Sequence, residues 1–171
     1  FEGGIGSVGD IPTMKISYDT VFSLTKNNGK ITKNGYTFSH WVRGGTTTTY
    51  KDGQLGLKNL TAVDGEVIKL EAVWNKEDYT ITYDLDGGSL VSGKTNPTSY
   101  NINTETFTLN NPIKPGYTFK GWTGSNGTTA QSTVSIAKGS TGNKNYKANW
   151  EIINYEITYD LGGGKLASGK T

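Results

Sequence analysis

One histidine, His40, and no cysteine occur in the 171-residue sequence, which limits the covalent chemistry that the chain could perform. A histidine activates a serine nucleophile when an acidic residue orients its ring. Serine and aspartate are present, but the sequence has no Gly-x-Ser-x-Gly segment that would place a serine on a strained turn. The lack of cysteine removes disulfides, thiolate metal sites and cysteine nucleophiles together. We therefore interpret His40 as a strand or turn residue beside Trp41.

Two neighbouring carboxylates, Asp84 and Asp86 in the segment DLDGGS, resemble the start of a calcium-binding loop. Such a loop needs a bidentate glutamate at its twelfth position, where this sequence has Thr95. A later copy of the segment reads DLGGG, so Gly162 stands in place of Asp86. Paired carboxylates for glycoside hydrolysis would need a larger rigid cleft than small modules offer. We predict a turn at DLDGGS and no catalytic, metal-binding or cofactor-binding residue.

Aromatic side chains are the remaining candidates for ligand contact, because a tyrosine or tryptophan ring can stack on a sugar. Tyr50 and Tyr146 lie near predicted loops, and we identify them as candidate ligand-binding residues. The other prominent rings recur in register between two parts of the chain, and we predict that they form structural cores. This core set is Tyr36, Phe38, Trp41, Trp74, Tyr117, Phe119, Trp122 and Trp150.

The composition excludes several classes of protein. Hydrophobic residues make up 33%, aromatic residues 11% and charged residues 19% of the chain, so the composition is not that of a disordered protein. A net charge of +2 is too small to indicate nucleic-acid binding. Apolar runs are only a few residues long, and we expect no membrane insertion within this segment. The 24 glycines, with many threonines and asparagines, favour strands and turns over helices.

An internal repeat organises these residues. The segment YTITYDLDGGSLVSGKT starts at Tyr79, and YEITYDLGGGKLASGKT starts 76 residues later at Tyr155. The segment AVW at 72–74 is followed at the same offset by ANW at 148–150, and GYTFSHW at 35–41 precedes GYTFKGW at 116–122. Three agreeing pairs of segments indicate tandem modules. We predict a truncated first module at 1–76, a complete second module at 77–151 and the opening hairpin of a third at 152–171.

Alternating patterns predict the strands within a module. In YTITYDL, Tyr79, Ile81, Tyr83 and Leu85 share one face, as in a half-buried strand, and the glycines that follow predict a tight turn. In GYTFKGW the same pattern places Tyr and Phe on one face. The second module is predicted to close with strands at 133–137 and 145–150. The first is predicted to close with a buried strand that begins near Val67.

Three ordered motifs resemble those of a known family. These are the opening Tyr-x-Ile-Thr-Tyr-Asp-Leu-x-Gly-Gly, the central Pro-Gly-Tyr-Thr-Phe-x-Gly-Trp and the closing Ala-x-Trp, and together they cover essentially the whole chain. They resemble the Listeria–Bacteroides repeat, the group that includes the B-repeat of listerial internalins. The resemblance implies a β-grasp-like (ubiquitin-like) module, mainly β with little helix, and offers no catalytic residues. His40 departs from the pattern, since Gly121 occupies its place in the second module.

The repeats and the resemblance predict a non-enzymatic tandem repeat segment of a larger bacterial cell-surface or secreted protein. Such a segment would act as a stalk or spacer and as a surface for adhesion. The alternative is a carbohydrate- or host-protein-binding module that uses exposed aromatic rings. The partner would then be an unidentified protein or glycan, with no nucleic acid and no cofactor.

The position of the third copy suggests a further hypothesis. The opening strand at 155–161 has no counterpart at the front of the first module. The C-terminal strand of one chain could therefore complete the first module of another, giving head-to-tail self-association. The competing interpretation is a dangling tail at an arbitrary boundary, and both stay open at this stage.

Overall fold

A computed structural model describes residues 7–168, and these residues form strands and no helix. The prediction of a mainly β chain is therefore confirmed. A β-grasp fold combines a sheet with a helix, so the β-grasp assignment stays a prediction. The segment FEGG and the end of the predicted third module, 169–171, lie outside the described residues.

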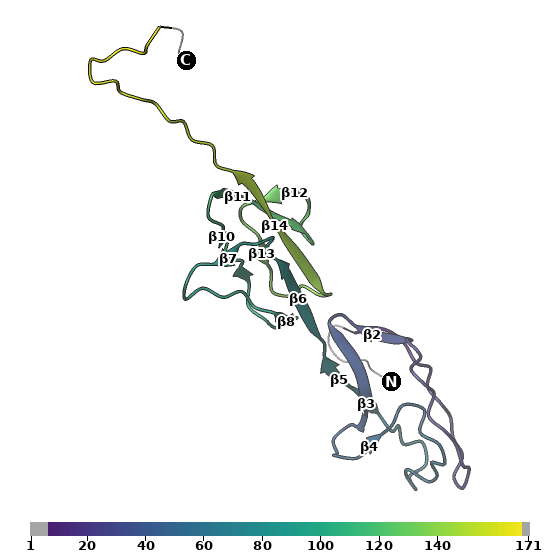
Figure 1. The fold of residues 1–171 in the computed structure, drawn as a ribbon. Coiled ribbons are helices and arrows are strands. Elements are labelled where there is room, and N and C mark those ends of the chain that lie inside the picture. Colours follow the sequence, from purple (N-terminus) through teal and green to yellow (C-terminus); the bar gives the residue numbers. More distant parts are fainter. Residues whose placement is uncertain (1–6, 169–171) are drawn as a thin grey trace.

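The first module is built on one five-stranded sheet (Figure 1). Its strands follow the order β1-β2-β3-β4, and β5 pairs with the other edge of β3. All of these pairings are antiparallel. The strands are β1 (Ser7–Gly9), β2 (Ile31–Lys33), β3 (Tyr36–Arg43), β4 (Thr49–Tyr50) and β5 (Leu70–Lys76).

The second module carries a mixed five-stranded sheet in the order β12-β11-β14-β6-β8. Its first and last strands, β6 and β14, lie side by side and parallel at the centre, and the other pairs are antiparallel. The predicted alternation along β6 is confirmed, with Tyr79, Ile81 and Tyr83 turned inward. The sheet strands are β6 (Asp78–Asp84), β8 (Ser99–Asn101), β11 (Tyr117–Gly124), β12 (Gly127–Gln131) and β14 (Lys144–Ile152).

Two short ribbons cover the second sheet. One pairs β7 with β10, and the other pairs β9 with β13, both antiparallel. Their strands are β7 (Ser89–Leu90), β9 (Phe107–Thr108), β10 (Pro112–Ile113) and β13 (Ser135–Ile136). In the first module, the bridge between Phe22 and Leu57 takes the place of the β9–β13 ribbon.

A β-bulge interrupts the strand of each Gly-Tyr-Thr-Phe segment, β3 in the first module and β11 in the second. Along β11, Phe119 lies opposite Trp150 and Gly121 lies opposite Asn149, so Lys120 is an extra residue. The bulge reverses the alternation, because one inserted residue moves every later side chain to the other face. Phe119 and Trp122 therefore share a face although they are three residues apart. Along β3 the extra residue is Ser39.

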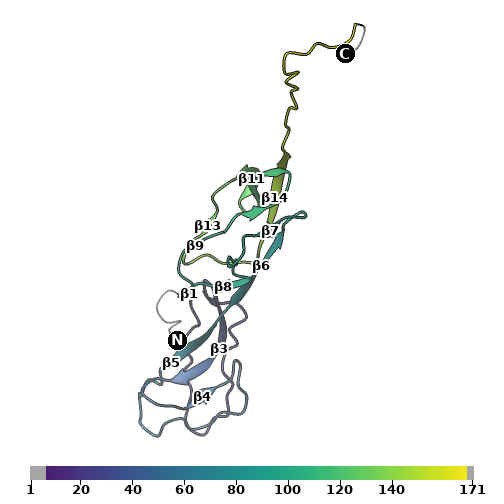
Figure 2. The ribbon, with the colours of Figure 1, turned by 60° about the vertical axis from the view of Figure 1, so that its left-hand side comes forward.

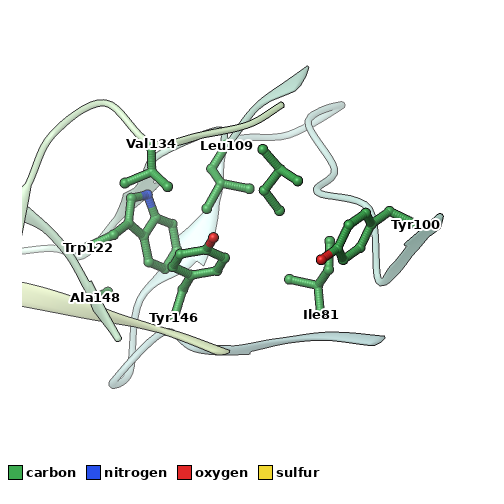
Figure 3. Close-up of a cluster of buried hydrophobic side chains, with 8 residues drawn as sticks. Ile81, Tyr100, Leu109, Trp122, Val134, Tyr146 and Ala148 are labelled. Carbon is green, nitrogen blue, oxygen red and sulfur yellow. The ribbon is translucent and has the colours of Figure 1, made fainter. Parts of the chain in front are cut away.

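Each module has its own core of buried side chains. In the second, Trp122 is fully buried beside Tyr146, with Val134 and Leu109 over them (Figure 3). The Trp122 indole N–H donates to Oδ1 of Asn111 at 3.0 Å. The first core comprises Ile11, Leu24, Ile31, Trp41, Tyr50 and Leu70. Neither buried cluster contains a residue of the other, so each module buries its apolar surface by itself.

The tyrosines of the second core are held in their neutral form. Tyr83 stacks on Tyr146 with ring centroids 6.1 Å apart and donates its hydroxyl to the carbonyl of Pro97 at 2.8 Å. Burial, and then the neighbouring Tyr146, raise the pKa of Tyr83 from its ordinary value of 10.0 to about 12. Burial also raises the pKa of Tyr100 and of Tyr146.

Two expectations for the ends of the modules need correction. Val67 is exposed, and the final strand of the first module begins at Leu70, after the turn at Asp64–Gly65. Residues 153–168 contain no strand, although the turn after Asp160 is present and Gly162 and Gly163 have positive φ. An opening hairpin therefore does not form in the described part of the predicted third module. The boundaries at 76/77 and 151/152 stay predictions.

We expect Trp122→Ala to lower the free energy of unfolding of the second module by about 3–5 kcal/mol, because it removes the largest fully buried side chain of that core. Urea unfolding followed by amide hydrogen exchange would resolve the two modules. The first module should be unaffected, and Ile113→Ala, at an exposed position, should cost far less. Equal losses in both variants would contradict this assignment of the core.

The bulge on β11 predicts that a side chain at Gly121 destabilises the second module. Gly121 has a φ of +129°, and a Cβ there would lie 2.6 Å from the backbone of Gln131 on β12. His40 occupies the equivalent position in the first module with a negative φ. Gly121→Ala should destabilise the second module by roughly 1–3 kcal/mol. The matched change His40→Gly should cost the first module only about 0.5–1 kcal/mol, and the opposite ranking in thermal unfolding would refute this prediction.

Alkaline pH should weaken the second module. Because the folded state raises the pKa of Tyr83 above its unfolded value, its contribution is complete below pH 10.0 and is lost as pH rises towards about 12. Urea midpoints at pH 8 and pH 11 would measure this loss. Tyr83→Phe should reduce the difference between the two midpoints, whereas Tyr155→Phe, in the exposed tail, should leave it unchanged.

Candidate functional site

His40 lies on β3, partly buried, with its Nδ1 2.9 Å from the Ser39 hydroxyl oxygen. It lines an open hollow of about 450 Å³ together with Thr49, Tyr50, Lys51 and Gln54. No carboxylate lines this hollow. The structure therefore does not bring the histidine, a nucleophile and an acid together at this place. His40 directly follows the β-bulge of β3, which is consistent with a structural role for this residue.

The two tyrosines proposed for ligand contact are both buried. Tyr50 is 6% exposed and Tyr146 is 5% exposed, and each belongs to the core of its own module. Tyr146 packs edge-on against Trp122 with ring centroids 6.4 Å apart. The expectation that these rings lie at the surface is thus wrong, because strand pairing places both side chains on the inner face. Ligand binding by either residue stays a prediction without an exposed ring to support it.

The predicted core residues divide into a deep and an outer group. Trp41 and Trp122 are fully buried. Phe38, Trp74, Phe119 and Trp150 are partly buried and pack against those cores, with the Trp150 indole N–H donating to the carbonyl of Leu85 at 3.1 Å.

The tyrosines of the two Gly-Tyr-Thr-Phe segments, Tyr36 and Tyr117, lie nearer the surface. The Lys33 ammonium lies 4.6 Å from the ring centre of Tyr36, and that of Lys114 lies 4.3 Å from the ring centre of Tyr117. A cation over an aromatic face is an attractive contact. Tyr117 is 37% exposed, and neither ring belongs to the buried core of its module or to the side chains packed against that core, unlike the other predicted core residues.

Asp84 belongs to a turn, as the sequence indicated. Its Oδ1 accepts the backbone N–H of Asp86 at 3.0 Å, and Asp160 accepts that of Gly162 at 2.8 Å in the next copy. The carboxylate at this position closes the turn in both copies, whereas the residue two positions later varies. No cluster of three or more metal-ligating side chains occurs among residues 7–168.

The junction between the modules is the most specific arrangement in the chain. Glu77 alone separates β5 from β6, so the last strand of one module runs into the first strand of the next (Figures 1 and 2). The Glu77 N–H donates to the carbonyl of Gly35 at 3.0 Å. The Tyr79 hydroxyl donates to Oε2 of Glu77 at 2.7 Å, a bond that raises the pKa of Tyr79.

A close approach of Gly35 and Ile102 completes the junction. Gly35 has a φ of +74°, and a Cβ there would lie 2.7 Å from Cδ1 of Ile102 in the second module. The absence of a side chain on Gly35 therefore lets the two modules meet. Sequence analysis missed this contact, because the glycine of each Gly-Tyr-Thr-Phe segment indicates a turn but not what the turn touches.

The same junction bond recurs at the far end of the second module. The Ile153 N–H donates to the carbonyl of Gly116 at 3.0 Å, and these residues are the repeat counterparts of Glu77 and Gly35. Gly116 has a φ of +78° with no atom close to its missing Cβ. The end of the second module therefore repeats the hydrogen bond and the glycine conformation found at the end of the first.

No helical segment of residues 7–168 has the length and apolar character needed to cross a membrane.

Comparisons with known proteins agree with the repeated architecture. The family model for the Listeria-Bacteroides repeat domain matches residues 2–61 and 79–149, more than half of the chain. Searches of curated proteins and of solved structures gave no match. The two matched segments correspond to the two modules that share the bulge, the aromatic core and the junction bond. The chain belongs to the Listeria-Bacteroides repeat family.

Proposed function

We propose that this chain is a non-enzymatic stalk or spacer segment of a larger bacterial cell-surface or secreted protein. The repeat family is a structural family of surface repeats and occurs in bacterial surface or secreted proteins. In this role, modules joined end to end hold other parts of the protein at a distance. Adhesion is a second role that the outer faces of such a stalk would serve.

The junction is the observation that carries this proposal. A flexible linker would let two modules tumble independently, but a single residue between two strands leaves little freedom. The bond from Glu77 to Gly35 and the packing of Ile102 on Gly35 add contacts on both sides of that residue. The two sheets accordingly follow one another along the chain direction in both views (Figures 1 and 2).

The alternative function, carbohydrate or host-protein binding through exposed aromatic rings, has less support. Its two candidate residues, Tyr50 and Tyr146, are buried. A glycan array probed with the 171-residue chain would test it directly, and the absence of specific binding would remove the carbohydrate version of this alternative.

Replacing the junction glycine should loosen the stalk. Gly35→Val would drive a side chain into Ile102, whereas Gly116→Val imposes the same backbone strain at a turn without a neighbour. We expect small-angle scattering of the unaltered chain to give an elongated particle. The Gly35 variant should give a broader distribution of distances, and the Gly116 variant should resemble the unaltered chain. A compact particle, or identical scattering of all three proteins, would contradict the stalk proposal.

A further inference from the structure

The chain crosses the second module from its opening strand β6 to its closing strand β14. The two strands lie side by side and parallel, in four pairs that run from Ile81 opposite Lys144 to Asp84 opposite Lys147. We call these four pairs the parallel ladder. Both strands point away from the first module (Figures 1 and 2). The chain therefore enters the module at one end of the parallel ladder and leaves it at the other.

Tension along an array of modules acts on these two strands in opposite directions. It pulls β6 backwards from Glu77 and β14 forwards from Ile152, so the force runs along the strands and across the hydrogen bonds between them. In this shear geometry every pair of the parallel ladder resists at once. A force applied to the neighbouring ends of the two strands would instead separate the pairs one after another.

Two side chains extend the parallel ladder beyond its backbone pairs. Before the first pair, Oδ1 of Asn143 accepts the backbone N–H of Thr80 at 3.0 Å. Beyond the last pair, the Trp150 indole N–H donates to the carbonyl of Leu85 at 3.1 Å. Both bonds join the closing segment, 143–152, to the backbone of the opening segment, 78–85. They are therefore loaded together with the ladder.

Packing between the same two strands prevents them from sliding. Ile81 is buried, and the Tyr83 ring stacks on that of Tyr146, its partner in the parallel ladder, with ring centroids 6.1 Å apart. Because side chains alternate between the two faces of a strand, a shift that restores both the hydrogen bonds and the inward faces must cover two residues, about 7 Å. The ladder and this ring contact must therefore break before any new pairing forms.

The sheet order sends tension directly from β6 to β14. β14 is also held by β11 through seven pairs, and β6 is also held by β8 through three. In the order β12-β11-β14-β6-β8, neither β11 nor β8 lies between the strand at which the chain enters and the strand at which it leaves. The parallel ladder is therefore the part of the sheet that tension loads first.

We propose that the parallel ladder, together with the bonds of Asn143 and Trp150, is a clamp that keeps the second module folded when the stalk is under tension. The proposal deepens the stalk function and rests on it for the direction of the load. Resistance to force depends on the rate of unfolding, whereas stability in urea depends on the equilibrium free energy of unfolding. The two quantities can therefore be separated by experiment.

Force spectroscopy on the 171-residue chain tests the direction of the resistance. The chain has no cysteine, so introduced cysteines fix the points at which force is applied. Lys76→Cys with Asn154→Cys, both at exposed positions, loads β6 and β14 in shear and leaves the first module outside the stretched segment. Lys76→Cys with Thr141→Cys holds the neighbouring ends of the two strands, since Thr141 lies shortly before β14. We expect the shear arrangement to require at least about twice the force, because four pairs resist together instead of singly.

Two asparagines provide matched variants within the shear arrangement. Asn143→Ala removes the acceptor of the Thr80 N–H. Asn149→Ala makes the same change but removes bonds to Gly121 and Thr123 on β11. At constant force, Asn143→Ala should raise the unfolding rate roughly fivefold, the factor for one hydrogen bond that is lost in the transition state, and Asn149→Ala should raise it less than about twofold. Urea midpoints should give the opposite ranking, because the bonds of Asn149 are partly buried and more numerous.

Equal forces for the two cysteine arrangements would overturn the proposal, and so would unfolding rates under force that follow the urea midpoints of the asparagine variants. Either result together with an elongated particle in small-angle scattering would remove the clamp and leave the stalk. A compact particle together with the expected difference in force would do the reverse.

Discussion

The extra residue in the strand of each Gly-Tyr-Thr-Phe segment is the constraint on which the rest of the fold depends. A regular strand would turn Phe119 and Trp122 to opposite faces, and one of the two rings would then lie in solvent. The bulge at Lys120 brings both rings to the inner face, above Trp150 and Ala148 of the neighbouring strand. With 33% hydrophobic residues, the chain depends on these rings for burial. The bulge at Ser39 does the same in the first module, so a spacing that looks irregular is a requirement of the core.

The two modules accommodate the bulge with different backbone conformations at the residue that follows it. In the second, Gly121 adopts a positive φ, and the Asn149 side chain donates to its carbonyl and to the Thr123 hydroxyl. In the first, His40 keeps a negative φ and lies opposite Val73. The only histidine of the chain thus occupies a position at which the backbone conformation differs between the two repeats.

The strand order within a module explains how successive modules are joined end to end. Because β14 and β6 lie together at the centre of the sheet and run parallel, the chain enters and leaves a module in the same direction. The end of β5 can then continue as β6 after Glu77 alone. The bond from Ile153 to Gly116 repeats this junction one module later. The same order gives the opening strand of the second module two neighbours, β14 and β8.

The sequence by itself determined the repeat, the mainly β character, the alternation of β6 and the turn that Asp84 closes, because these depend on neighbouring residues. Tertiary structure decided the burial of Tyr50 and Tyr146. Each lies near a loop in sequence, but pairing of Tyr50 with Trp41 and of Tyr146 with Gly124 turns both rings inward. It also decided the approach of Gly35 to Ile102. Those outcomes depend on which strands lie side by side, and a local pattern carries no information about which strands pair.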